Sequence, residues 1–295
     1  MTKNLKFKTW LEFTDDLKKE WIYLFSLSNN SIFQSYDWQF LWFEEIKKKS
    51  FKESLMVVGV YSESKIIGIF PFELRKTLGL NNLRLTGFPF ADYLDCLIDK
   101  KIILKNFDFE SELLEYLKKN KKIDIIQLTN LTENSNFYQF LKDTKFKKNT
   151  FKSFQILKKE NQSQMINKKF SLDTKRQIKR LSLLGKITFK IAETNNEKKE
   201  IIDFFFKHKE KQLIRTNNWN FLKNQTYKLF LKKLFTQKYS HNSFLLLNDE
   251  IIAVHLGFKD LKKMFYIFPT FTHKYYNYSP GNILLLKLVN SFFEE

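Results

Sequence analysis

The sequence has few residues that cross-link, break or loosen a chain. It contains one cysteine, Cys96, which excludes an intramolecular disulfide and any metal site that needs several thiolates. With only 7 glycines and 4 prolines in 295 residues, it does not belong to the collagen-like or low-complexity classes, and long disordered loops are disfavoured. No apolar run is long enough to span a bilayer, because the best candidate, residues 283–293, is short and contains Lys287 and Asn290.

Acidic residues are scarce relative to basic ones. The chain has 51 Lys and Arg against 32 Asp and Glu, a formal net charge of +19. This balance favours anionic partners, namely a nucleotide cofactor, tRNA or an anionic membrane surface. A biased base composition would also produce many Lys, Asn, Ile and Phe residues, and this alternative stays open. The sequence has no zinc-knuckle, helix-turn-helix or RNA-reading motif, so we expect no specific DNA binding.

The single cysteine and the first residues of the chain bear on its location. One unpaired cysteine fits a reducing compartment. The N-terminal residues have no long apolar core of the kind found in signal peptides. We therefore expect a cytoplasmic protein, either free or peripheral at the inner face of the membrane.

The order of predicted elements occurs twice along the chain. A strand at Leu5, two helices and a hairpin around residues 67–69 return as a strand at Ile187, two helices and a hairpin around residues 252–254. The offset between the copies is nearly constant, which indicates a duplicated domain. We therefore predict an α/β fold with two domains, residues 1–160 and 161–295, joined by a polar linker near residues 158–170.

The two copies differ in two respects. Phe70 of the first copy corresponds to His255 of the second. The second copy also has no counterpart of residues 123–157, in which we predict a strand, a helix and a closing strand. We therefore expect the second domain to be incomplete at its C-terminus, with an exposed sheet edge unless another segment covers it.

The stretch from Phe244 to Val289 carries the most specific signal. It predicts a hairpin, a third strand, an aromatic loop and a helix that opens with Ser279-Pro280-Gly281. Proline is favoured at the first helical position, and glycine leaves the backbone bare. Free N–H groups and the helix dipole at such a start favour a phosphate. An ordinary capped helix is the alternative interpretation.

Three side chains are candidate catalytic groups. His255 lies on the small-residue face of a strand, between Ala253 and Gly257, where a neutral imidazole could act as general base. A buried structural histidine is the alternative. Asp92 and Asp95 follow a strand in an aromatic stretch, and burial would raise their pKa values. Ordinary turn or cap chemistry is the alternative for both.

A basic helix, predicted over residues 171–184, is a candidate anion-binding element. It carries Lys175, Arg176, Lys179 and Arg180, which suit a phosphate or a lipid head group. A solvated helix face is the alternative. Cys96 lies among apolar residues and is expected to be inert. We predict no metal site.

Four segments, taken together and in this order, resemble the GNAT superfamily of N-acetyltransferases. The similarity is to its acetyltransferase-like subfamily of cellulose and exopolysaccharide biosynthesis, which is distantly similar to Fem-type aminoacyl transferases. The segments are Phe33-Gln34-Ser35-Tyr36-Asp37-Trp38, Asp92-Tyr93-Leu94-Asp95, Ile251-Ile252-Ala253-Val254-His255-Leu256-Gly257-Phe258 and Tyr278-Ser279-Pro280-Gly281-Asn282-Ile283-Leu284-Leu285. The resemblance implies tandem GNAT-like domains, each a mixed, mostly antiparallel sheet flanked by helices.

The same resemblance implies a cofactor and the residues that bind it. Acetyl-CoA or another acyl-CoA would be the co-substrate, held at Tyr278, Ser279, Gly281 and Asn282. The family's phosphate turn usually has Gln or Arg three residues before its first glycine, where this chain has Tyr278. That difference leaves room for a donor of another kind.

We therefore expect an acyltransferase. It would move an acetyl or acyl group to the amine or hydroxyl of a small-molecule, glycan or peptide acceptor, in cell-envelope or exopolysaccharide biosynthesis. Two alternatives stay open. A Fem-like aminoacyl transferase would use aminoacyl-tRNA, and a non-catalytic accessory protein of polysaccharide synthesis would keep the fold without cofactor binding.

Overall fold

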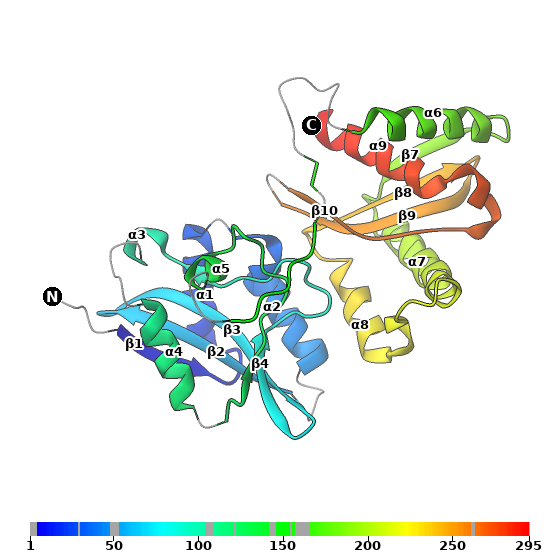
Figure 1. Ribbon diagram of the computed structural model, residues 1–295. Coiled ribbons are helices and arrows are strands. Elements are labelled where there is room, and N and C mark those ends of the chain that lie inside the picture. Colours follow the sequence, from blue (N-terminus) through cyan, green and yellow to red (C-terminus); the bar gives the residue numbers. More distant parts are fainter. Residues whose placement is uncertain are drawn as a thin grey trace. The chain divides into compact units, whose positions relative to one another are not determined.

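The computed structural model describes residues 5–28, 30–47, 53–103, 109–120, 122–141, 146–153, 155–156, 166–260 and 263–294. The chain divides into two compact units, Met1–Lys148 and Asn149–Glu295. Figure 1 shows a separate sheet in each unit. Residues 158–165, most of the expected linker, lie outside the described residues, so the boundary at 160 and 161 stays a prediction.

The first unit has a mostly antiparallel sheet in the order β1-β2-β3-β4-β6, with β5 paired to β3. Only the β4–β6 pair is parallel. Its strands are β1 (Leu5–Trp10), β2 (Glu53–Ser62), β3 (Lys65–Thr77), β4 (Leu80–Leu85), β5 (Leu97–Ile98) and β6 (Ile125–Ile126). Its helices are α1 (Asp15–Leu27), α2 (Tyr36–Trp42), α3 (Lys100–Ile103), α4 (Phe109–Lys119) and α5 (Asn136–Leu141).

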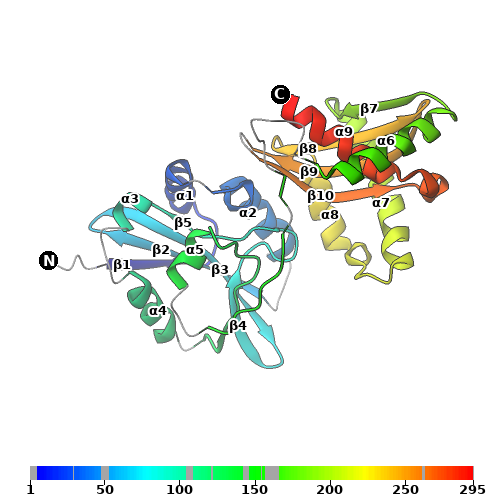
Figure 2. The ribbon, with the colours of Figure 1, turned by 45° about the horizontal axis from the view of Figure 1, so that its top comes forward.

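The second unit has a four-stranded antiparallel sheet in the order β10-β9-β8-β7. Its strands are β7 (Ile187–Ile191), β8 (Ser240–Leu247), β9 (Glu250–Lys259) and β10 (Met264–Phe271). Its helices are α6 (Lys168–Ser182), α7 (Asn195–Arg215), α8 (Gln225–Leu234) and α9 (Pro280–Glu294), with the 3-10 segment η5 (His273–Tyr278) before α9. Figures 1 and 2 show α6 and α9 side by side on one face of this sheet and α7 on the other.

The two sheets share their strand order and a matching irregularity. In the first unit the β2–β3 register shifts between Val60 and Tyr61, directly after Val60 pairs with Gly68. In the second unit the β8–β9 register shifts between Leu245 and Leu246, directly after Leu245 pairs with Ala253. These positions are separated by one constant offset, and β-bulges are usually retained within families. The predicted fold class, with two related sheets flanked by helices, is confirmed.

Sequence patterns explain why the helices that open each unit begin and pack as they do. Thr14 caps α1 through its hydroxyl, which accepts the Leu17 N–H at 3.4 Å. Leu17, Trp21 and Leu24 follow at helical spacing and are buried in the core of the first unit. In the second unit Thr194 and Glu197 form a reciprocal capping box at the start of α7.

The segment that was expected to have no counterpart in the second copy is more irregular than predicted. Only β6 and α5 form between residues 123 and 157 among the described residues, and residues 151–153 and 155–156 belong to no strand. Residues 151–153 are exposed, with 92% of Phe151 accessible. In the described part of this segment the predicted closing strand is therefore wrong, because Phe151 and Ile156 are exposed and do not pack in a core.

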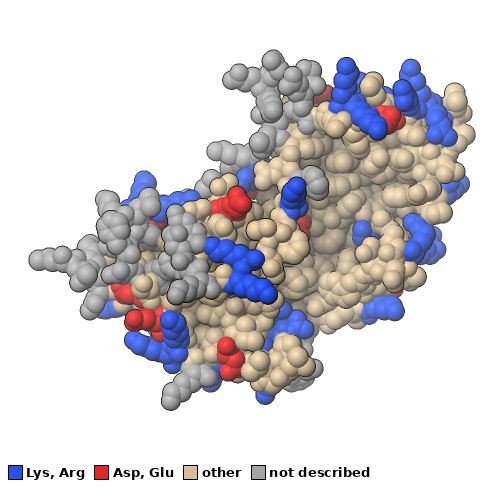
Figure 3. Space-filling model, in the orientation of Figure 1, with Lys and Arg blue, Asp and Glu red and all other residues tan. Residues whose placement is uncertain are grey.

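The distribution of basic side chains and the hydropathy of the helices can now be compared with what the composition indicated. On the face in Figure 3, Lys and Arg side chains are spread over both units, and a group of them gathers over α6. In the described part of the chain, no helix has both the length and the apolar character needed to cross a membrane.

Candidate active site

The turn between β10 and α9 is built by an unusual backbone at Ser279. This residue has φ 50° and ψ 53°, the left-handed region that a non-glycine residue seldom adopts. Its carbonyl accepts the N–H groups of Asn282 at 3.0 Å and Ile283 at 3.2 Å, and its own N–H donates to Tyr276 at 3.0 Å. Proline has no N–H, so the Gly281 N–H is the first backbone donor of α9. The turn thus offers fewer free backbone N–H donors than a helix start without proline.

Gly281 also has a packing role. A Cβ atom at this position would lie 3.3 Å from Cδ1 of Phe271, at the end of β10. The missing side chain therefore lets the start of α9 approach the strand. The predicted need for glycine has a structural cause in addition to room for a phosphate.

Helix α6 brings a positive charge to this turn. The Arg180 guanidinium lies 5.3 Å from the centre of the Tyr278 ring, and its Nη1 donates to Oε1 of Gln177 at 3.0 Å. Tyr278 holds the position at which related turns usually have Gln or Arg, so Arg180 supplies a guanidinium from a neighbouring helix. The sequence identified Arg180 as a candidate anion ligand but gave no sign that it lies beside the turn.

One carboxylate connects η5 to the β8–β9 hairpin. Oε2 of Glu250 accepts from Nζ of Lys274 at 2.8 Å and from the Tyr275 hydroxyl at 3.0 Å. The Lys274 ammonium lowers the pKa of Glu250, with a smaller contribution from Tyr275. The segment that leads into Ser279 is thereby held to the hairpin turn.

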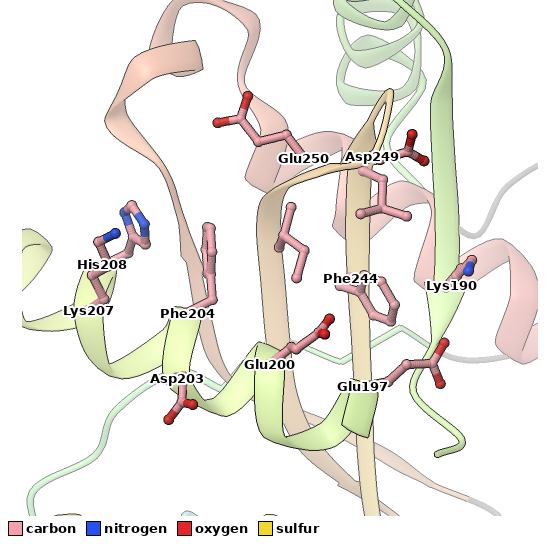
Figure 4. Close-up of a pocket in the computed structure, with 12 residues that line it drawn as sticks. Lys190, Glu197, Glu200, Asp203, Phe204, Lys207, His208, Phe244, Asp249 and Glu250 are labelled. Atoms are coloured by element: carbon pink, nitrogen blue, oxygen red, sulfur yellow. The ribbon is translucent and has the colours of Figure 1, made fainter. Parts of the chain in front are cut away.

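Glu250 also lines an open groove of about 720 Å³ on the α7 face of the sheet (Figure 4). The side chains of Phe204 and His208 stack with ring centres 4.1 Å apart. The other carboxylates of the groove are Glu197, Glu200, Asp203 and Asp249, and its cations are Lys190 and Lys207. Within a strongly basic chain, this excess of acidic groups gives the groove a complementary charge for a cationic amine.

His255 is fully buried, on the face of β9 that also carries Ala253. The ring stacks on Tyr266 with centres 4.4 Å apart. Burial lowers the pKa of His255 to about 3, and nearby His241 adds to this effect while the Phe265 backbone opposes it. The imidazole is therefore neutral at pH 7 and a weak base in this conformation. Its role as general base stays a prediction.

The polar neighbours of His255 were not predicted from the sequence. Ser243 pairs directly across the sheet with His255, and in the first unit Val58 pairs with Phe70 at the matching positions. Ser243 and His255 are both 0% exposed, so both side chains lie in the core of the second unit. The available signal was the run of four polar residues at the start of β8, Ser240 to Ser243. A buried polar patch thus replaces apolar core in the second unit.

The two candidate aspartates belong to the first unit and differ in role. The Asp95 carboxylate accepts the backbone N–H groups of Cys96 at 2.8 Å, Asn136 at 2.9 Å and Phe137 at 2.8 Å. It therefore caps α5, although burial still raises its pKa. Asp92 is exposed, and desolvation by the surrounding protein raises its pKa. Asp92 retains the chemistry of a base, whereas the oxygens of Asp95 are occupied.

The two sequence motifs of the first unit lie together. The Gln34 amide donates to the Tyr93 carbonyl at 2.7 Å, and the rings of Phe33 and Tyr93 lie 6.1 Å apart. The motif that begins at Phe33 therefore positions the segment that contains Asp92. Cys96, next to this segment, is buried, and burial raises the pKa of its thiol, in agreement with an inert cysteine.

The second unit matches a known family. Residues 168–295 match the family model described as acetyltransferase (GNAT) domain. This match covers most of the second unit, which therefore resembles a GNAT domain. Across the whole chain, the fold is similar to that of FemX, with a TM-score of 0.55 at 10% sequence identity over 96% of this chain and 85% of FemX. The recognised similarity to the GNAT superfamily and to Fem-type proteins is thus confirmed, and FemX shows that the likeness extends over both units.

Two shorter acetyltransferase structures were also found, at lower structural similarity. An aminoglycoside acetyltransferase from an uncultured soil metagenomic sample, solved with sisomicin, has 18% identity and a TM-score of 0.34 over 52% of this chain and 97% of its own. Glucosamine-6-phosphate N-acetyltransferase from Arabidopsis thaliana has 17% identity and a TM-score of 0.27 over 53% of this chain and 99% of its own. No curated protein sequence matches the chain.

The GNAT domain supports acyl transfer as the general chemistry of the second unit. Its turn between β10 and α9 has a bare backbone at Gly281 and a guanidinium from Arg180, so these residues suit an anionic donor. His255 and the turn lie in the same unit, whereas Asp92 and Asp95 lie in the other.

Proposed function

We propose that the chain transfers an acetyl or acyl group from acyl-CoA to an amine or hydroxyl acceptor in cell-envelope or exopolysaccharide biosynthesis. The observation that carries this proposal is the Ser279–Gly281 turn beside Arg180, within a GNAT domain. The acyl thioester of the donor supplies the reactive carbonyl. The residues of the chain would bind and orient the donor and the acceptor, and would remove a proton from the acceptor.

On the donor side, the turn would attract the anionic donor in two ways, through a directional hydrogen bond and through the longer-range helix dipole. The Gly281 N–H would donate a hydrogen bond to the anionic donor, and the positive end of the α9 dipole would add to the attraction. Arg180 adds a fixed cation that also stacks on Tyr278. Together these groups would hold the anionic end of the donor.

On the acceptor side, the acidic groove suits a protonated amine before reaction. Its carboxylates attract the cation, and Phe204 provides an apolar surface for the rest of the molecule. The acceptor nitrogen must lose a proton before it attacks the acyl carbon, after which the carbon–sulfur bond breaks and the thiolate takes a proton. Within the second unit, His255 is the proposed base for the first proton transfer.

Calorimetric titration of acetyl-CoA into matched variants tests the proposal. Gly281→Val should weaken binding by more than about tenfold, because the side chain would occupy the phosphate position. Because Phe271 also contacts this position, a second variant that leaves the backbone of the turn unaltered is needed. Arg180→Gln is that variant, and it should weaken acetyl-CoA binding by about fivefold or more.

Arg176→Gln, one helical turn earlier in α6, is the matched control and should bind acetyl-CoA as the unaltered chain does. If Gly281→Val and Arg180→Gln both bind acetyl-CoA normally, α9 is an ordinary capped helix and the turn is not a donor site. The accessory-protein interpretation would then be preferred.

The fold similarity to FemX over both units favours one second candidate, a Fem-like aminoacyl transferase that uses aminoacyl-tRNA. Such an enzyme would also hold a phosphate-bearing donor, so the same basic groups would serve. A thermal-shift comparison of acetyl-CoA, longer acyl-CoA species and charged tRNA separates the two. Stabilisation by charged tRNA alone would favour the aminoacyl donor.

A further inference from the structure

Helix α6 buries one stripe of residues and leaves the opposite stripe exposed. Thr174, Ile178 and Leu181 follow at spacings of four and three, and Leu181 belongs to the core of the second unit with Ile178 packed against it. Because an α-helix turns through about 100° per residue, positions 172, 176, 179 and 183 lie on the far side. The outer face of α6 is therefore not part of the core.

The exposed stripe combines apolar and basic side chains. Leu172 is 47% exposed, and Leu183, which ends the helix, is 85% exposed. Leu184, in the turn that follows, is 48% exposed. The basic residues of the helix that accompany them are Lys168, Lys169, Lys175, Arg176, Lys179 and Arg180. The single acid of α6, Asp173, pairs with Arg176 at 3.3 Å.

This arrangement has the two attractions that hold a helix at a lipid surface. Leucine side chains on the outer ridge gain free energy when they leave water for the boundary of the acyl chains. The flanking cations are attracted to anionic head groups. Each cation raises the membrane partition coefficient by about tenfold or less. A merely solvated helix would not need leucines at the centre of its exposed side.

We propose that the outer face of α6, together with Leu183 and Leu184, docks the protein on an anionic lipid bilayer. The occupant is a lipid surface and not RNA, because single-stranded RNA is bound largely through aromatic stacking. The outer stripe carries leucines where RNA-binding surfaces have aromatic residues. Figure 3 shows that the Lys and Arg side chains over α6 are exposed to solvent.

Docking through α6 would place the candidate donor turn next to the membrane. Arg180 of this helix lies over Tyr278, so the helix that meets the lipid also contacts the segment before α9. An acceptor carried at the bilayer surface would then not have to diffuse through solution. The docking itself requires no donor and no catalysis, so it can be tested separately from the proposed acyl transfer.

Vesicle flotation of the full chain tests the docking. The chain should float with vesicles that contain phosphatidylglycerol, should not float with pure phosphatidylcholine vesicles, and should bind less as salt rises. Leu172→Ser with Leu183→Ser should lower the partition coefficient about tenfold. Lys175→Gln with Lys179→Gln should lower it about tenfold or more.

Two variants with the same types of substitution, placed outside α6, serve as controls. Leu78→Ser removes a leucine that is 98% exposed in the β3–β4 turn, and Lys118→Gln with Lys119→Gln removes an exposed basic pair at the end of α4. Both should float as the unaltered chain does. Circular dichroism should show an unchanged fold for every variant, because all the altered side chains are exposed.

Three results would overturn the proposal. Equal losses in the α6 variants and in the controls would mean that any positive or apolar surface residue suffices. Normal binding by the leucine variant together with loss in the lysine variant would mean simple charge attraction without docking of the helix. Retarded migration of bulk tRNA by the chain, lost in the lysine variant, with no flotation on anionic vesicles, would assign this face to RNA.

Discussion

At the scale of single residues, His255 is the position where the two units differ most in chemistry. Phe70 at the matching place in the first unit packs within an aromatic cluster with Phe109 and Phe137. In the second unit a glycine makes room for the imidazole, since a Cβ at Gly257 would lie 2.4 Å from Nε2 of His255. Removing an imidazole from water costs free energy, so His255 is expected to lower the stability of the second unit.

The pH dependence of unfolding tests the state of His255. Its pKa is about 3 in the folded chain, against an ordinary value of 6.5. The unfolded chain therefore binds one more proton between these values, and the free energy of unfolding falls as pH falls from about 6.5 towards 3. His255→Gln should remove about 2 kcal/mol of this loss between pH 6 and pH 4.

Urea denaturation across that pH range measures the effect. His273→Gln, at an exposed histidine of η5, is the control and should leave the slope unchanged. An unchanged slope in His255→Gln would show that the imidazole is accessible to protons in the folded protein. That result would strengthen the general-base interpretation.

At the scale of elements, the connection between η5 and the hairpin turn is made by exposed groups. The side chains of Lys274 and Glu250 are 60% and 48% exposed, so their ion pair is screened by water and contributes little to global stability. Its effect should be local, in the ordering of the segment that leads into Ser279. The lowered pKa of Glu250 means that this contribution is present at neutral pH and is lost as pH falls through the folded pKa.

Glu250→Gln should therefore speed amide hydrogen exchange in residues 273–279 and leave the melting temperature nearly unchanged. Hydrogen exchange followed by mass spectrometry resolves this segment. Asp249→Asn, the neighbouring acid in the same groove, is the matched control and should exchange as the unaltered chain does. If both variants exchange alike, the carboxylate of Glu250 does not order η5.

Local elements were predictable from the sequence, whereas contacts between distant elements were not. The β8–β9 hairpin, β10 and the helix that starts after Ser279 follow from alternating apolar residues and from Pro280 and Gly281. The position of Arg180 over Tyr278 depends on how α6 packs against α9, which no periodicity encodes. The left-handed backbone at Ser279 was likewise not visible, since serine rarely adopts it.

At the scale of the whole molecule, duplication explains both the resemblance and the difference between the units. The constant offset was visible in the sequence because each copy keeps its strand and helix order. The polar patch of Ser243 and His255 replaces apolar residues at the same sheet positions. The first unit keeps an apolar core on this face, and the second unit, which matches the GNAT family model, has polar groups buried there.

Net charge is the remaining property of the whole chain, and it predicts a salt dependence. With 51 basic and 32 acidic residues, like-charge repulsion destabilises the compact state. Raising a monovalent salt from low to several-fold physiological concentration screens this repulsion and should raise the melting temperature, by about 2–4 °C for each kcal/mol relieved. Different monovalent salts should act alike if screening is the cause. A melting temperature that falls with salt would mean that ion pairs such as Lys274–Glu250 outweigh the repulsion, and the excess charge would then be balanced locally.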